Sequence, residues 1–275
     1  VWLDELFPDL PAFLEGQTGH VAVRLPCPSS RLATVLEYDD GRWIANHGTV
    51  DRVFDQGRGV PETWRSTFPV VSALVRCDHR RDTVLTFPNR LGPTSSRYDA
   101  LVKIYAQDGA LLAEGAVPIP QNGVARLSAR ELLTSRGIGL PMLAGAEVTV
   151  RPAARMAETP AVLDLLVGLT EDDRLLGEVQ VGSDFFNADV PPGLRMPDVR
   201  RTRTFGRVLL GAGRRSWIFL ANPAGRDPYD GVAHPSVTLV DRSGVEQAVV
   251  DLELPPHGAV LLDVADAFPD AEKLL

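Results

Sequence analysis

A cluster of arginines in the second half of the chain is the clearest candidate for chemistry. Five lie within one stretch of 13 residues: Arg195, Arg200, Arg201, Arg203 and Arg207. A guanidinium grips a carboxylate, sulfate or phosphate through two parallel hydrogen bonds, so convergent arginines would form an anion site. On a strand, however, Arg201 and Arg203 would share one face and Arg200 would take the other. The alternative is that these arginines pair with nearby aspartates or charge a solvated edge against self-pairing.

Large aromatic side chains accompany the charged residues in both halves of the chain. Phe54 and Trp64 lie in the first half, and Phe185 and Phe186 in the second. Aromatic rings next to arginines form sugar platforms or the central contacts of protein interfaces. Such rings also pin long loops to a core. Ligand binding and plugging of the fold are therefore both open for these four residues.

Candidate acid–base groups are few. Asn46-His47 precedes Asp51 and Arg65, which makes His47, Asp51 and Arg65 the first suspects if the protein is an enzyme. The tripeptide Cys77-Asp78-His79 combines a thiol, a carboxylate and an imidazole, yet the charged run that follows it is typical of a hairpin turn. No known nucleophile, phosphate-loop or metalloprotease motif occurs, and no pair of histidines has metal-ligand spacing. We expect neither a cofactor nor a metal.

An internal repeat organises the elements that must position these residues. Residues 102–109 match residues 237–244 without a gap, at a separation of 135 (244 − 109 = 135). The same separation continues through residues 119–127 and 254–262. Upstream, residues 83–89 match residues 216–222 at a separation of 133 (216 − 83 = 133). The repeat predicts two related modules, residues 1–143 and residues 144–275.

A short signature closes each unit and also opens the chain. It occurs as Asp4-Glu-Leu-Phe7-Pro, as Arg130-Glu-Leu-Leu133 and as Asp266-Ala-Phe268-Pro. The chain therefore starts with the end of a unit. Either the first segment is permuted and completes the opposite end of the molecule, or the chain is a slice of a longer tandem array.

Local patterning within each module is that of β-structure. Short runs alternate between apolar and polar residues, and Gly, Asp and Pro punctuate them, as in residues 237–244 and 249–263. We expect an all-β protein: two tandem antiparallel β-sandwiches with little helix beyond single turns that begin near Ser128 and Asp263. Long loops at residues 48–68 and 182–205 are inserted in these modules and carry the arginines and aromatics.

These motifs resemble bacterial immunoglobulin-like or transducer-like β-sandwich repeats. The resemblance lies in the Asn222-Pro223 turn, the hairpin of residues 237–244, the turn of residues 254–258 and the apolar residues that close the unit at 260–268. It covers roughly the last third of each module and implies adhesion, spacer, carbohydrate-binding or signalling roles. It carries over no catalytic residue, and the long loops depart from it.

Charge and composition limit the classes of partner. The formal net charge of −8 lacks the basic excess that a nucleic-acid binder uses to displace counterions. No apolar run approaches the roughly 18 residues of a membrane span, so we expect a soluble protein, bacterial and either cytoplasmic or secreted. Cys27 and Cys77 show no metal spacing and leave a disulfide undecided.

Together these patterns favour a non-enzymatic recognition or scaffold protein. Its partner would be a carbohydrate or another protein, bound through the long loops. The alternative is an enzyme of lyase or cyclase type without a familiar motif, with a pocket between the modules or in a loop-capped sandwich.

Overall fold

The structure, a computed structural model, describes the chain in several stretches. They are residues 7–9, 12, 33–37, 43–47, 70–88, 98–120, 123–152, 164–182, 206–211, 213–223 and 228–274. Strands dominate them, helix is scarce, and every pairing between named strands is antiparallel. The all-β prediction is confirmed at that level.

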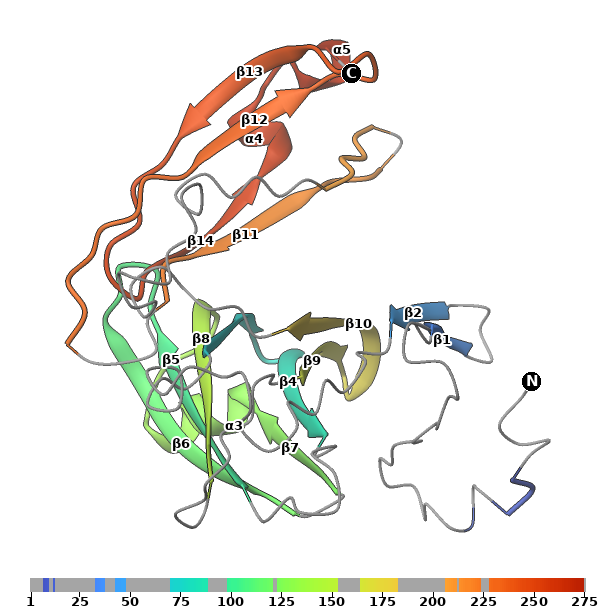
Figure 1. Ribbon diagram of the computed structural model, residues 1–275, viewed down its shortest axis with the longest axis vertical. Helices are drawn as coiled ribbons and strands as arrows, with labels where there is room; N and C mark the ends of the chain where they lie inside the picture. Colours follow the sequence, from blue (N-terminus) through green and yellow to red (C-terminus); the bar gives the residue numbers. More distant parts are fainter. Residues whose placement is uncertain are drawn as a thin grey trace, which may run out of the picture.

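Two four-stranded sheets form the larger part of the described fold (Figure 1). One has the order β3-β8-β5-β6, with bounds Val70–Cys77, Met142–Pro152, Tyr98–Tyr105 and Leu111–Ile119. The other has the order β10-β9-β4-β7, with bounds Arg174–Gly182, Asp164–Glu171, Arg81–Pro88 and Val124–Ser128.

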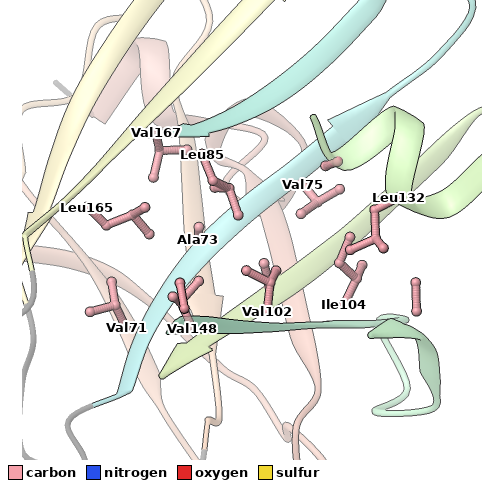
Figure 2. Packing of buried hydrophobic residues seen from close by; sticks show 14 of the residues in the cluster. Val71, Ala73, Val75, Leu85, Val102, Ile104, Leu132, Val148, Leu165 and Val167 are labelled. Carbon is pink, nitrogen blue, oxygen red and sulfur yellow. The ribbon is translucent and has the colours of Figure 1, made fainter. Parts of the chain in front are cut away.

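One hydrophobic core joins these two sheets. Strand β3 alternates strictly, so that Val71, Ala73, Val75 and Cys77 are buried while the residues between them are only half-buried. Figure 2 shows β3 residues packing with side chains of β5 and β8 from the same sheet and with Leu85, Leu165 and Val167 from the other. Alternation with one buried face is what an antiparallel sheet packed on a core requires.

A single helix, α3 (Ala129–Ser135), closes one end of this core. Ser128, the last residue of β7, is its N-cap, and the Ser128 hydroxyl accepts a hydrogen bond from the Glu131 N–H. Leu132 and Leu133 are buried against the strands. The helical turn and its cap are as the sequence predicts, because a hydroxyl at the N-cap satisfies an N–H that the helix leaves without a partner.

The C-terminal part contains two further strand pairs, drawn orange to red in Figure 1. β11 (Trp217–Ala221) pairs with β14 (Ala259–Asp263), and β12 (Ser236–Val240) pairs with β13 (Glu246–Asp251). Two short helices follow, α4 (Val264–Ala267), with Asp263 as its N-cap, and α5 (Ala271–Leu274). They pack into a small core that contains Leu239, Val264, Phe268 and Ala271.

The register of these C-terminal pairs repeats that of the N-terminal ones. Leu101 faces Ala116, and 135 residues later Ser236 faces Asp251 (236 − 101 = 135; 251 − 116 = 135). Even the irregularity recurs, between Ile104 and Tyr105 and between Leu239 and Val240. Likewise, the β4–β7 pair that begins at Val84 and Ser128 has the register of the β11–β14 pair that begins at Trp217 and Asp263.

Equivalent turns use equivalent chemistry. Gly109 and Gly244, which are 135 residues apart (244 − 109 = 135), have φ of 86° and 83° and close the two matching hairpins. Only glycine adopts this left-handed backbone without strain. A hydroxyl bridges the ends of two neighbouring strands in both places: Thr83 Oγ1 accepts from the Arg76 N–H, and Ser216 Oγ accepts from the Leu209 N–H.

Strand pairing runs across the boundary predicted between residues 143 and 144. β8 begins at Met142 and lies between β3 and β5, and β9 pairs with β4. Strands β8, β9 and β10 therefore belong to the same sheets as strands that precede them in the chain. A remaining hairpin, β1 (Ala33–Glu37) with β2 (Trp43–His47), lies beside β10 in the structure (Figure 1).

Candidate functional site

The most concentrated group of polar and aromatic contacts joins the two parts of the fold. It is centred on His257, in the turn between β13 and β14, where the backbone takes a φ of 60°. The turn is held by the Gly258 N–H, which donates to Pro255 O, and by the His257 N–H, which donates to Asn222 O. A histidine at positive φ is uncommon, which indicates that its side chain has a specific task.

A buried ion pair links this turn to the larger core. His257 Nδ1 lies 2.8 Å from Glu147 Oε1, and the two side chains are 11% and 8% exposed. Glu147 lies in the middle of β8, 110 residues earlier in the chain. Because an ionised carboxylate can only accept, the Nδ1–H donates to it, and the shielding of both groups from water strengthens their attraction.

Aromatic rings enclose the His257 imidazole. Tyr105, the last residue of β5, stacks on it with ring centroids 4.5 Å apart and planes inclined by 11°. Tyr229 approaches edge-on at 5.7 Å and 79°. The imidazole therefore lies between rings from both parts of the fold. This packing fixes its orientation and excludes water from the ion pair.

Asn222 organises the C-terminal side of this group. Its Nδ2 donates to the carbonyl oxygens of Gly231, Leu254 and Pro255, at 2.7, 3.1 and 3.0 Å, and its Oδ1 accepts from the Tyr229 hydroxyl. Asn222 is 6% exposed. Its side chain thus ties the end of β11 to the chain on both sides of β13.

Backbones of the two parts also approach closely beside this ion pair. The Ala259 N–H donates to Gln107 O at 3.2 Å. A Cβ at Gly109 would come 2.1 Å from the Pro256 carbonyl oxygen, and one at Gly145 would come 3.0 Å from the Ala259 Cβ. Glycine is required at position 109 by this approach as well as by its φ. We call the set Tyr105, Glu147, Asn222, Tyr229 and His257 the junction cluster.

A second polar cluster lies inside the larger core, around Asp82. Its carboxylate accepts from the Ser128 hydroxyl, from the Arg130 N–H at 2.8 Å and from Cys77 Sγ at 3.5 Å. Asp82 is 3% exposed. These bonds connect β3, β4 and the start of α3. The carboxylate therefore replaces lost water contacts with protein donors, as a buried charge must.

Cys77 does not act as a nucleophile with His79. Burial, reinforced by the nearby Asp82 carboxylate, raises the pKa of the Cys77 thiol to about 12, so the thiol is protonated near neutrality. His79 lies in the exposed turn that follows, where Asp78 accepts from the Arg80 and Arg81 N–H groups. The turn prediction for this segment is confirmed, and Cys77 is a free, buried thiol.

Most of the residues that the sequence singles out lie outside the described residues. These are Asp51, Phe54, Trp64, Arg65, Phe185, Phe186, Arg195, Arg200, Arg201 and Arg203. His47 is the last residue of β2, and Arg207 is exposed near the start of the C-terminal part. Their grouping into a site therefore stays a prediction.

The sequence analysis missed the junction cluster. One signal was present: the repeat aligns His257 with Asn122, each followed by Gly (257 − 122 = 135). Asn is a common residue at left-handed backbone positions, whereas His there implies a contact that compensates the strain. The partner Glu147 had no comparable signal, because strand alternation does not tell which distant turn lies over it.

Two further observations limit the chemistry of the described part. Within it, no three His, Cys, Asp or Glu side chains are grouped so as to hold a metal ion. None of its helices is long and apolar enough to cross a membrane.

Comparisons with known proteins give no match: no family model, no curated protein and no solved structure is similar to the chain.

Proposed function

We propose that the protein is a non-enzymatic recognition or scaffold protein built from two related β-sandwich modules. The first is centred on β4–β7 and the second on β11–β14. The shared strand registers, the recurring irregularity after Ile104 and Leu239 and the matching helix caps Ser128 and Asp263 support the relationship. Independent hairpins would have no reason to share these features.

The junction cluster is the observation that carries this proposal. Its acid–base groups, His257 and Glu147, bond to each other and are enclosed by Tyr105 and Tyr229. This arrangement suits a fixed joint between modules better than a catalytic pair, which must reach a substrate. A fixed joint would hold the loops of residues 48–68 and 182–205 in a constant relation, as a recognition surface requires.

The ligand class follows from those loops. Arg195, Arg200, Arg201, Arg203 and Arg207 form a concentration of guanidinium groups in a chain with a formal net charge of −8. Planar forks match carboxylate and sulfate geometry, and neighbouring aromatics match sugar faces. The proposed partner is therefore an acidic carbohydrate or an acidic protein segment.

A thermal-shift screen tests the proposal. The purified chain is heated with uronic-acid, sulfated and neutral oligosaccharides and with acidic peptides, because ligands of the native state raise the melting temperature. We expect a shift with an acidic class and its loss in the double variant Arg201→Ala/Arg203→Ala. The charge-matched control is Arg214→Ala/Arg242→Ala, at two exposed turn positions. Equal shifts in both double variants, or none with any acidic compound, contradict the proposal.

A further inference from the structure

The outer edge of β11 differs from that of its counterpart in the first module. β4 lies between β7 and β9, whereas β11 pairs with β14 alone among the described strands. Leu85 and Phe87 of β4 are fully buried, at 0% exposure, but the equivalent residues Ile218 and Leu220 are only half-buried. The second module therefore has an edge, and apolar side chains beside it, that a further strand would cover.

The N-terminal hairpin has the register of the strands that cover β4. Ala33 faces His47, as Leu166 faces Gln180, and both positions differ by 133 (166 − 33 = 133; 180 − 47 = 133). The match continues from strand to strand as far as Leu36–Ile44 and Leu169–Gly177. Two adjacent aspartates follow in each case, at 39–40 and 172–173. β1–β2 is thus the counterpart of β9–β10.

Both partners are incomplete in isolation. β1–β2 and β11–β14 are two-stranded sheets, and β2 lies beside β10 without joining its hydrogen-bonded ladder. Two-stranded sheets are marginally stable in water, and a third or fourth strand with an apolar face makes them stable. Placing β1 along β11 would produce a four-stranded sheet in the order β2-β1-β11-β14, parallel in design to β10-β9-β4-β7.

We propose that the free edge of β11 is a docking site for the hairpin β1–β2 of the same chain, a second position beside the one it has near β10. The β4–β9 ladder fixes the register. Val84 faces Gly168, so Trp217 would face Val35. Asp82 faces Thr170, so Arg215 would face Glu37, which places opposite charges across the strands. Trp217, now 50% exposed, would be partly covered.

The length of the chain favours the same molecule over a second copy. From Gln180 in β10 to Ser216 before β11 the chain advances 36 positions (216 − 180 = 36). From His47 in β2 to Thr83 in β4 it also advances 36 (83 − 47 = 36). The first stretch leads from one module to the other, so the second is long enough to lead back. A tethered hairpin also acts at a high effective concentration, about millimolar for a flexible tether.

Disulfide trapping tests this inference and needs no ligand. The variant Val35→Cys/Trp217→Cys, in a Cys27→Ser background, is oxidised and analysed by non-reducing electrophoresis and peptide mapping. Cys77 is buried and does not compete. Residues that face each other across an antiparallel pair have the Cβ spacing a disulfide needs. We expect a monomer with the 35–217 linkage, and no linkage in the control Val35→Cys/Val249→Cys, which uses an exposed residue of β13.

Two outcomes overturn the inference. A covalent dimer linked through 35–217 would assign the hairpin to a second copy of the chain. Free thiols in both this variant and Ala33→Cys/Phe219→Cys, the pair two positions along the same register, would show that β11 does not take the hairpin. Circular dichroism of each reduced variant confirms its fold before oxidation. The inference rests on the relatedness of the modules proposed above and is independent of the acidic-ligand proposal.

Discussion

Glu147 and His257 form a buried ion pair, with Oε1 and Nδ1 2.8 Å apart, although one lies in a strand of the larger core and the other in a turn of the C-terminal part. The pair places a charged contact where the two parts meet, and Tyr105 stacks on the imidazole that makes it. Rigid coupling of the two parts is the physical consequence, because separating them would expose or orphan both groups.

Replacing the histidine of this pair should cost stability. His257→Ala leaves the Glu147 carboxylate buried without its partner, and breaking a buried pair in this way costs about 3 kcal/mol. Urea unfolding at neutral pH measures the change. The control is His234→Ala, because His234 and Glu253 are both largely exposed at their 3.9 Å contact, and we expect a change within about 0.5 kcal/mol. Equal losses in the two variants would contradict a structural role for the junction cluster.

Asp82 should be the most sensitive carboxylate of the larger core. Asp82→Ala removes the acceptor of the Ser128 hydroxyl and of the Arg130 N–H, and we expect a loss of about 3 kcal/mol in the free energy of unfolding. Asp108 provides the comparison, since it accepts from Ala110 N–H in an exposed turn, and Asp108→Ala should cost about 1 kcal/mol or less. Chemical denaturation of both variants decides whether the burial of Asp82 has this weight.

Acid should weaken the turn between β12 and β13. The Val245 N–H holds the pKa of Asp241 below its ordinary value, with further help from the Ser243 N–H and the Gln247 amide. A lowered pKa in the folded state means that the carboxylate stabilises the fold above the unfolded pKa, near about 3.9. This contribution is lost as pH falls through the lower, folded-state pKa.

The melting temperature measured from pH 7 to pH 2 tests this expectation. The difference between the wild type and Asp241→Asn should be largest near neutrality and should shrink below about pH 4. Asp230→Asn, at an exposed position, serves as the control for removal of one negative charge. A difference that stays constant across the range would rule out ionisation of Asp241 as its cause.

The Cys77 thiol should be unreactive in the folded protein. Its pKa of about 12, which burial raises, leaves almost no thiolate at pH 8. In a Cys27→Ser background, a disulfide reagent should therefore modify the native protein slowly and the urea-unfolded protein rapidly. Fast modification of the native state at pH 8 would contradict the burial of Cys77.

Much of the local structure is predictable from the sequence. The alternating runs and the spacing of Gly109 and Gly244 predict two matching hairpins, and Ser128 and Asp263 predict the caps of short helices. These features depend on neighbouring residues, whose periodicity and turn chemistry are visible in the chain itself.

Long-range pairing is not predictable in the same way. Strand β8 alternates as other strands do, and nothing in that pattern tells that it inserts between β3 and β5. The same holds for Glu147, whose partner is 110 residues away. Which strands become neighbours depends on the shape of the whole core and on the connections between strands. A boundary placed by sequence similarity alone therefore falls beside a strand that belongs to the preceding sheets.

The central claim, recognition without catalysis, is tested most directly by following one acidic ligand from the thermal-shift screen by proton NMR in the presence of the protein. We predict saturable broadening of the ligand signals, abolished in Arg201→Ala/Arg203→Ala and retained in His257→Gln, with the ligand chemically unchanged after overnight incubation. Steady conversion of the ligand into a new compound, lost in His257→Gln, would contradict the account and assign catalysis to the junction cluster.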